Sequence, residues 1–494
     1  MGSATAAVGR AAVRGPLSRD VRLFWCASAT DALGTQASGV VLPLLLLGLG
    51  YSAATVGLVA GVSTAAGLLL APLAAVPADR GARKPVMLWS AVVSALAMGG
   101  VAVAAAAGRP PLTLLLGAVL VERFSTAVYE AAAAGTVALI APPADSPRVV
   151  AGLSAADQGA LVLGPALGGA LYQASRALPF VADAVSYTVA AVCVSALKSD
   201  LRPGEGAPGG ATGPGEGPLG GATGPGEGPL GGATGPGEGP LGAGHSARAD
   251  GPGALNTADA HSPASPLPRR PALDSADPAH TPAPSPPRRP ASRPALRAEL
   301  GAGLALVRTS PFLRLVLIWT ATVNAVIVAL YYGAVFTLQK GGHGGAPMGL
   351  VLALSGAAGL VGSLAAPRIA GRISASRLLV TVTWLLVPLA AALATAKDPW
   401  TYGGLFGAFC LLMPLVTVVL QSRAIQETPP ALQARTGAVL ATAVGGSAAL
   451  APVVAGVCAS SAGTAAPAVA SAALLTLLAC WTTYVRIPAR GVAV

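Results

Sequence analysis

Charged residues are scarce in this sequence of 494 residues, because aspartate, glutamate, lysine and arginine together make up only 10% of it. An average soluble domain carries roughly a quarter charged residues. A chain with less than half of that share cannot cover the surface of a soluble protein of this length with polar side chains. The composition therefore excludes a soluble enzyme, a disordered protein and a nucleic-acid-binding protein.

Aromatic residues are also few, at 4%, whereas hydrophobic residues reach 53% and the mean hydropathy is +0.66. The apolar part consists mainly of alanine, valine, leucine and glycine, and small residues favour close packing of membrane helices. The formal net charge of +11 has a simple origin in such a protein, because cytoplasmic loops are rich in lysine and arginine. We therefore expect a protein embedded in the lipid bilayer that binds no nucleic acid.

Cysteine and histidine are rare too, with five and four residues. The cysteines all lie in or at the edge of apolar runs, at Cys26, Cys193, Cys410, Cys458 and Cys480. Their spacing matches neither a metal site nor a disulfide framework, so we interpret them as small buried apolar residues. We expect no metal, no cofactor and no enzyme activity, because the sequence contains no recognisable pair of nucleophile and base.

Long apolar runs dominate what remains. A membrane-spanning helix needs roughly 20 mostly apolar residues. Twelve runs meet this requirement, near 24–48, 52–77, 84–107, 111–140, 149–173, 178–197, 312–338, 346–366, 377–396, 400–424, 434–460 and 464–486. They form two blocks of six, which predicts an all-α polytopic membrane protein with two pseudo-symmetric bundles of six transmembrane helices. The first run is long enough to span, so we interpret it as a transmembrane helix and not as a cleavable signal peptide.

The two blocks are separated by a segment of different character, residues 199–298. It contains the 11-residue sequence GGATGPGEGPL three times, starting at Gly209, Gly220 and Gly231. Such a segment has too few apolar residues to offset the entropy lost on ordering. The predicted organisation is a cytoplasmic segment 1–23, an N-terminal bundle 24–198, a disordered cytoplasmic linker 199–298, a C-terminal bundle 299–487 and a cytoplasmic tail 488–494.

Lysine and arginine are distributed unevenly between the two ends of the predicted spans. If the N-terminus is inside, the opposite side holds only Arg109, Arg176, Lys340 and Lys397. The positive-inside rule then places both termini and the linker in the cytoplasm. A composition rich in alanine, glycine, proline and arginine is typical of a bacterial genome of high GC content, so we expect the protein in a bacterial plasma membrane. We also expect it to be a monomer.

Ionisable residues within a membrane span are costly and mark functional sites by default. All the candidates lie in the first block, namely Asp31, Glu122, Arg123, Glu130, Asp157 and Asp183. We interpret Asp31, Glu130 and Asp157 as carboxylates at similar depth that line one inward cavity. For Glu122 and Asp183 we favour a structural role, in ion pairs or at helix ends in the headgroup zone.

Arg123 and Glu130 are seven residues apart, so they share one face of a helix, about 10.5 Å apart along its axis. At that distance they cannot pair directly, and each needs a partner on another helix or water. Desolvation and the charge of Arg123 act in opposite directions on a carboxylate in this cavity. Such a group is suited to taking up a proton on one side of the membrane and releasing it on the other.

The loop between the second and third predicted spans carries a recognisable motif. From Ala75 to Lys84 it reads AVPADRGARK, which is similar to G-x-L-a-D-R-x-G-R-K, the loop signature of the major facilitator superfamily. Asp79, Arg80, Arg83 and Lys84 match in place, whereas the leading glycine is replaced by Ala75. The resemblance implies that these four residues act as a latch for the outward-facing state.

The fifth predicted span contains a second motif, because Gly164 to Gly169 reads GPALGG. It is similar to the GPxxGG of the antiporter signature of the same superfamily, and the matching residues are Gly164, Pro165, Gly168 and Gly169. Glycine and proline bend a helix and let another backbone approach closely. In the family this motif separates exporters from importers, and Arg123 stands where the family's proton-transfer arginine is expected.

The stretches 303–315 and 421–437 resemble the macrolide- and siderophore-exporter branch of the superfamily. The resemblance implies proton-coupled efflux of a small amphipathic compound, such as an antibiotic, a siderophore or another specialised metabolite, by alternating access. The implied partners are that small molecule, protons and the lipid bilayer. Two alternatives remain open, namely an importer or symporter of the same fold and a membrane sensor or scaffold that does not transport.

Overall fold

The computed structural model describes residues 17–79, 83–108, 110–134, 136–142, 145–199, 304–370, 372–429 and 432–485. These residues form helices, turns and loops, and no strand occurs among them. Within these ranges, twelve helices are long and apolar enough to cross a membrane. The protein therefore has the all-α polytopic fold expected from its sequence.

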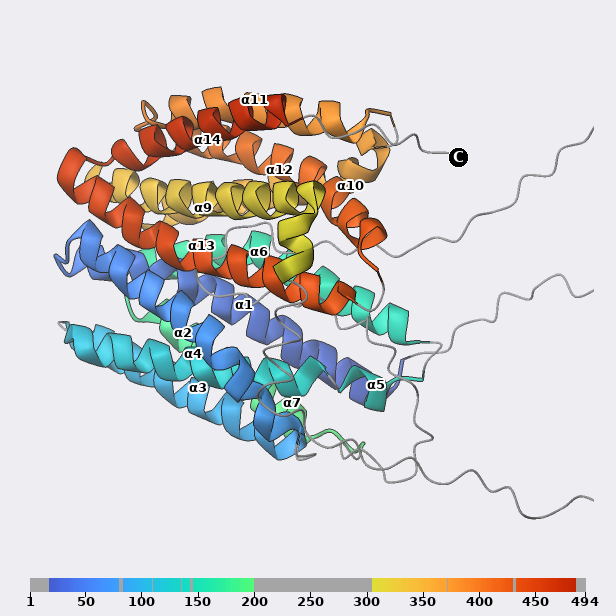
Figure 1. Cartoon of the computed structure of the whole chain (residues 1–494). Coiled ribbons are helices and arrows are strands. Elements are labelled where there is room, and N and C mark those ends of the chain that lie inside the picture. The colour runs from blue at the N-terminus through green and yellow to red at the C-terminus, as the bar shows by residue number, and fades with distance from the viewer. Residues whose placement is uncertain are drawn as a thin grey trace, which may run out of the picture. The chain divides into compact units, whose positions relative to one another are not determined.

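The helices fall into two halves (Figure 1). The N-terminal half consists of α1 (Arg19–Gly48), α2 (Ala53–Asp79), α3 (Arg83–Ala106), α4 (Leu112–Ala134), the short α5 (Val137–Ile140), α6 (Ser146–Ala174) and α7 (Leu178–Ser195). The C-terminal half consists of α9 (Pro311–Lys340), α10 (Gly345–Ala370), α11 (Ala375–Leu393), α12 (Pro399–Glu427), α13 (Gln433–Ala462) and α14 (Ala466–Tyr484). A further short helical stretch, 304–309, leads into α9.

Two helix boundaries differ from those predicted by the apolar runs. α1 begins at Arg19, five residues before the predicted span, because the Ser18 hydroxyl accepts a hydrogen bond from the Val21 N–H (3.3 Å) and caps a polar first turn. The predicted span 111–140 is interrupted, since α4 ends at Ala134 and α5 begins three residues later. The sequence has a glycine at position 135, and glycine is a poor helix former.

Parts of the predicted organisation lie outside the described residues. These are the N-terminal segment up to residue 16, the linker from residue 200 onward with its repeats, and the tail after residue 485. Of the loop motif, Arg80 also lies outside the described residues. The predicted domain boundaries and the role of the linker therefore stay predictions.

The helices of each half pack mainly against one another, and the two halves meet mainly through two pairs of helices. In the N-terminal half, α1 packs against α6 and α7, and α3 packs against α4 and α7. Between the halves, α2 packs against α13 and α6 packs against α10. The four helices that join the halves thus include α6, the helix of the GPxxGG motif (Figure 1).

The C-terminal half is held by buried aromatic residues. The Trp319 side chain is fully buried and donates a hydrogen bond to the hydroxyl of Thr383 (3.0 Å). The Tyr402 hydroxyl donates to the carbonyl oxygen of Leu330 (2.8 Å). Because lipid tails are as apolar as the side chains, van der Waals packing and hydrogen bonds between helices supply the stability of such a bundle. These contacts make the C-terminal half an apolar partner for the charged interior of the N-terminal half.

Candidate functional site

An ion pair lies inside the N-terminal half, on α4. Arg123 makes a bidentate contact with Glu122, with Nε at 2.8 Å from Oε2 and Nη2 at 2.9 Å from Oε1. Glu122 is 3% exposed and Arg123 is 7% exposed. Arg123 thus has a carboxylate partner on its own helix, in the residue that precedes it. The structural ion pair favoured for Glu122 is confirmed.

Hydroxyl groups complete the surroundings of the Glu122 carboxylate. The Tyr187 hydroxyl of α7 donates to Glu122 Oε1 (2.6 Å), and the Thr126 hydroxyl donates to the same oxygen (3.1 Å). The Thr35 hydroxyl of α1 lies 3.2 Å from the Tyr187 oxygen. The Glu122 carboxyl thus accepts four hydrogen bonds, and it ties α4 to α7 and, through Tyr187, to α1.

Asp183 of α7 is a second buried carboxyl, only 1% exposed. Its Oδ2 lies 2.5 Å from the Ser38 hydroxyl of α1, and its Oδ1 lies 3.4 Å from the Ser186 hydroxyl. Gly34 makes this approach of α1 and α7 feasible, because a Cβ atom there would overlap Ser186 and lie 2.7 Å from Asp183 Oδ1. Contrary to the structural interpretation, no ion pair and no helix end accounts for Asp183 among the described residues.

The carboxylates predicted to line a cavity are less buried than Glu122 and Asp183. Asp31 of α1 is half-buried, whereas Glu130 of α4 and Asp157 of α6 are exposed. All three nevertheless belong together electrostatically, because Glu130 and Asp157 both act on Asp31, as do Glu122 and Arg123. The structure thus brings the sequence-predicted residues Asp31, Arg123, Glu130 and Asp157 into one charged region of the N-terminal half.

The loop motif joins the ends of three helices. Asp79 is the last residue of α2, and Arg83 and Lys84 open α3. The Lys84 ammonium group donates to the carbonyl oxygen of Leu197, just beyond the end of α7 (2.6 Å). A cation at this position stabilises the C-terminal end of a helix. Lys84 therefore connects the motif to the point where the chain leaves the N-terminal half.

The GPxxGG motif packs against α1. A Cβ atom at Gly168 would overlap the carbonyl oxygen of Ala37, and one at Gly164 would overlap the side chain of Gln36. The Tyr172 hydroxyl, one turn beyond the motif, donates to the carbonyl oxygen of Leu44 (3.3 Å). The close backbone approach predicted from the motif is therefore confirmed, and α6 and α1 reach the same end of the bundle with their C-terminal turns.

The same motif also faces the other half of the protein. A Cβ atom at Gly169 would overlap the carbonyl oxygen of Gly345 in α10, and one at Gly349 would overlap that of Pro165. We call this contact the α6–α10 seam. Only residues without a side chain allow two backbones to approach this closely.

An equivalent contact, the α2–α13 seam, joins the halves on the other side. A Cβ atom at Gly57 in α2 would overlap the carbonyl oxygen of Pro452, and one at Gly456 in α13 would overlap that of Ala53. Both seams lie at the end of the bundle where α2 and α10 begin and where α6 and α13 end (Figure 1).

Away from the seams the same helices are less crowded. A Cβ atom at Gly67 in α2 or Gly159 in α6 would have no neighbouring atom within 4 Å. The closest backbone contacts between the halves at Gly57, Gly169, Gly349 and Gly456 thus lie at the end of the bundle with the loop between α1 and α2.

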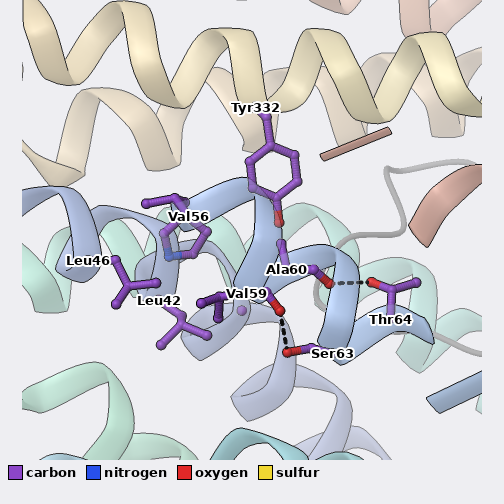
Figure 2. Close-up of a pocket in the computed structure, with 10 residues that line it drawn as sticks. Leu42, Leu46, Val56, Val59, Ala60, Ser63, Thr64 and Tyr332 are labelled. Carbon is purple, nitrogen blue, oxygen red and sulfur yellow. Dashed lines mark hydrogen bonds between the residues drawn. The ribbon is translucent and has the colours of Figure 1, made fainter. Parts of the chain in front are cut away.

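A small crevice of about 10 Å³, which is room for about one water molecule, lies between the halves near the seams and is lined by α1, α2 and α9. Its walls are mostly apolar, and its polar members Ser63 and Thr64 direct their hydroxyls at carbonyl oxygens of their own helix (2.7 and 3.0 Å). Figure 2 shows the ring of Tyr332 reaching from α9 with its hydroxyl pointing toward Ala60. The crevice thus combines apolar walls with one phenol from the opposite half.

Sequence reasoning missed several residues of this region. Tyr187, Thr35 and Ser38 complete the buried network, and Gly57 and Gly456 form the α2–α13 seam. Tyr187 could have been found from the sequence, because it lies four residues after Asp183 and therefore shares a helix face with it. No comparable signal marks the seam glycines in a chain with 63 glycines.

Two bundles of six membrane-spanning helices that pack against each other, one of them with ionisable groups in its interior, define the chain as a multi-pass membrane protein with the architecture of a secondary transporter. The chain belongs to the Major Facilitator Superfamily, whose profile it matches over residues 24–452. Among curated proteins, none matches the sequence.

Solved structures with the same fold include several transporters. The nucleoside transporter NupG is 11% identical, with a TM-score of 0.60, and the match covers 94% of this chain and 99% of NupG. A bacterial homologue of the human lysosomal transporter Spinster, inward-facing and occupied, is 13% identical, with a TM-score of 0.59 and coverage of 94% and 95%. The human organic anion transporter MFSD10 is 16% identical, with a TM-score of 0.53 and coverage of 95% and 100%. At these identities the likeness shows the fold alone.

Proposed function

We propose that this transporter exports small amphipathic compounds in exchange for protons. The observation that carries the proposal is the charged region of the N-terminal half, in which Glu130, Asp157 and Arg123 all act electrostatically on Asp31. In a membrane protein, exposed carboxylates such as Glu130 and Asp157 are costly unless they border water. They therefore line an aqueous cavity, and Asp31 and Glu130 are the carboxyls that load and release the proton.

The direction of transport rests on the GPxxGG motif of α6. Its residues contact α1 through Gly168 and α10 through Gly169, so the motif lies between the proton-binding half and its partner. A tightly packed, bent helix at this position excludes water from the interface between the halves. It thereby limits leakage of protons, as an exchanger requires, and supports membership of the exporter branch.

The orientation rests on the positive-inside rule, with both termini and the linker in the cytoplasm of a bacterium. With this orientation the two seams lie on the outer side of the membrane. The substrate enters from the cytoplasm or the inner leaflet, as an antibiotic, siderophore or similar metabolite would.

Proton coupling is tested with a fluorescent amphipathic dye loaded into cells that express the full chain. Dye export is expected to collapse when an uncoupler abolishes the proton gradient. Asp31→Asn and Glu130→Gln are each expected to slow export by roughly 5- to 150-fold, the usual range of coupling between two ligands, while the amount of folded protein stays the same. Asp398→Asn is the matched control, because Asp398 lies in the C-terminal half and caps the N-terminus of α12. It is not part of the charged region of the N-terminal half. Export that continues unchanged with the uncoupler would exclude proton coupling, and accumulation of dye would identify an importer.

A sensor or scaffold is distinguished from a transporter by the linker. A sensor or scaffold that signals through the linker should lose its role when residues 203–292 are deleted. An exporter lacking these residues is expected to retain export of the same dye within about twofold, because loops of this kind tolerate large changes in length. The amount of protein in the membrane serves as the control. A full chain that exports no dye, and whose role in the cell is lost with residues 203–292, would favour the scaffold.

A further inference from the structure

The two buried carboxyls of the N-terminal half are satisfied very differently. Glu122 has a bidentate guanidinium and two hydroxyl donors. Asp183 is 1% exposed and has no cation within 4 Å among the described residues. A buried carboxylate without a counterion is one of the costliest groups in a protein, and in a membrane the cost is greater still.

The hydroxyls near Asp183 cannot replace a counterion. A serine hydroxyl has a single hydrogen to donate. That of Ser186 is directed at the main-chain carbonyl oxygen of Asp183 (2.8 Å) and lies farther from the carboxyl (3.4 Å). Ser38 has two acceptors within reach, Asp183 Oδ2 at 2.5 Å and the carbonyl oxygen of Thr35 at 3.3 Å. An ionised Asp183 would thus have at most one donor to itself.

The charges around Asp183 also oppose a negative charge there. Glu122 of α4 and Asp31 of α1 act on it as like charges, and Arg123 acts on it as a cation. Arg123, however, is engaged with Glu122 in a bidentate pair. A second negative charge beside Glu122 therefore has no counterion of its own.

The other helices that pack against α7 bring no further cation to Asp183. α3 carries Arg83 and Lys84 at its start, and Lys84 binds the carbonyl oxygen of Leu197 at the far end of α7. Near the beginning of α7, Arg176 lies in the turn after α6 and is exposed. On α7 itself, the Tyr187 hydroxyl donates to Glu122.

We propose that Asp183 is a buried proton-binding site that holds its proton at neutral pH in this conformation. With the carboxyl protonated, Asp183 donates from Oδ2 to Ser38 Oγ, and the Ser38 hydrogen goes to the carbonyl oxygen of Thr35. The oxygen–oxygen distance of 2.5 Å is within the range of a hydrogen bond in either direction of donation. Every hydrogen then has an acceptor, and no net charge is buried at the α1–α7 contact.

The proton ties the charge of Asp183 to the pairing of Arg123. One guanidinium serves two buried carboxyls, so the carboxyl that it does not pair with must carry the proton. Loss of the Asp183 proton to water would place a second anion beside the Glu122–Arg123 pair and weaken that pair or the α1–α7 contact. Asp183 is thus a proton site separate from Asp31, Glu130 and Asp157. This proposal does not depend on the direction or the substrate of transport.

The test is an infrared pH titration of the purified full chain in lipid nanodiscs, with protons as the only probe. The wild-type protein is expected to show the carbonyl-stretch band of a protonated carboxylic acid at neutral pH, and Asp183→Asn is expected to lack it. Asp183→Asn should fold, because its amide is uncharged and similar in shape to the protonated acid. The proposal would be overturned if the wild-type spectrum at neutral pH lacked this band. It would also be overturned if Asp183→Asn left the band unchanged.

Two further variants assign the band without relying on Asp183→Asn. Ser38→Ala removes the acceptor of the carboxyl proton, so the band is expected to persist at a shifted frequency. Glu122→Gln removes the like charge and releases Arg123, so the band is expected to disappear at a lower pH than in the wild type. Glu130→Gln is the control and should leave the band in place. A band that neither Ser38→Ala nor Glu122→Gln changes would belong to another carboxyl and would contradict the proposal.

Discussion

Replacing Arg123 by leucine is expected to lower the free energy of unfolding by about 3–5 kcal/mol, the usual cost of removing one partner of a buried ion pair. The variant leaves the Glu122 carboxylate buried, with only the hydroxyls of Thr126 and Tyr187 as donors. Denaturant-induced unfolding of the purified full chain measures the change. Dye export is expected to be lost as well, because the charged region then lacks the cation that acts on Asp31.

The matched experiments separate the pair from its individual charges. Arg148→Leu changes an exposed arginine in the first turn of α6, so its effect should stay within about 0.5 kcal/mol. The double variant Glu122→Leu/Arg123→Leu removes both charges and should recover most of the lost stability, because apolar replacements of a buried pair are often neutral. If the double variant were as unstable as Arg123→Leu, the damage would come from packing and not from an unpaired charge. The recovered protein should still fail to export.

The fold could be predicted from the sequence because its signal is local. Each span is an apolar run of the required length, and lipid leaves the backbone of such a run little choice but to form a helix. The errors lie where polar residues continue a helix beyond the apolar run, as at Arg19 to Leu23 of α1. They also lie where an apolar run contains a break, as between α4 and α5.

The pairing inside the N-terminal half could not be predicted in the same way. Glu122 and Arg123 are neighbours in sequence, and their side chains point about 100° apart on an ideal helix. Spacing alone therefore places Arg123 on the same helix face as Glu130 and not beside Glu122. The pair forms because both side chains are long and because Tyr187 and Thr126 add donors from the same enclosed space. Those donors become visible only when α1, α4 and α7 are packed together.

The seams show the same limit at the level of the whole bundle. The GPxxGG motif of α6 predicted a close approach to another backbone, and the structure places the backbone of α1 against Gly168. The partner of Gly169 is Gly345, from the other half, and nothing in the motif identifies α10. Small residues are so common in this chain that their pairing depends on the relative position of the two halves.

A side chain introduced at either seam is expected to shift the protein away from the sealed conformation. Gly349→Val places a Cβ atom onto the carbonyl oxygen of Pro165 and within 3.1 Å of the Cα atom of Gly169. Both neighbours are backbone atoms that cannot rotate away, so overpacking costs about 1–3 kcal/mol. This energy corresponds to a shift of roughly 5- to 150-fold in the equilibrium between two conformations.

The shift can be measured as the rate at which a thiol in the crevice reacts with a maleimide, using Ser63→Cys as the reporter. Ser63 is 2% exposed and lies between the halves, so its replacement should react slowly in the sealed protein and 5- to 150-fold faster with Gly349→Val. Gly404→Val on α12 is the control, because a Cβ atom there meets nothing within 4 Å. An unchanged rate with Gly349→Val would mean that the backbone contact does not hold the halves together. Since the two seams are separate, Gly57→Val should act alone in the same direction and should add its free energy to that of Gly349→Val.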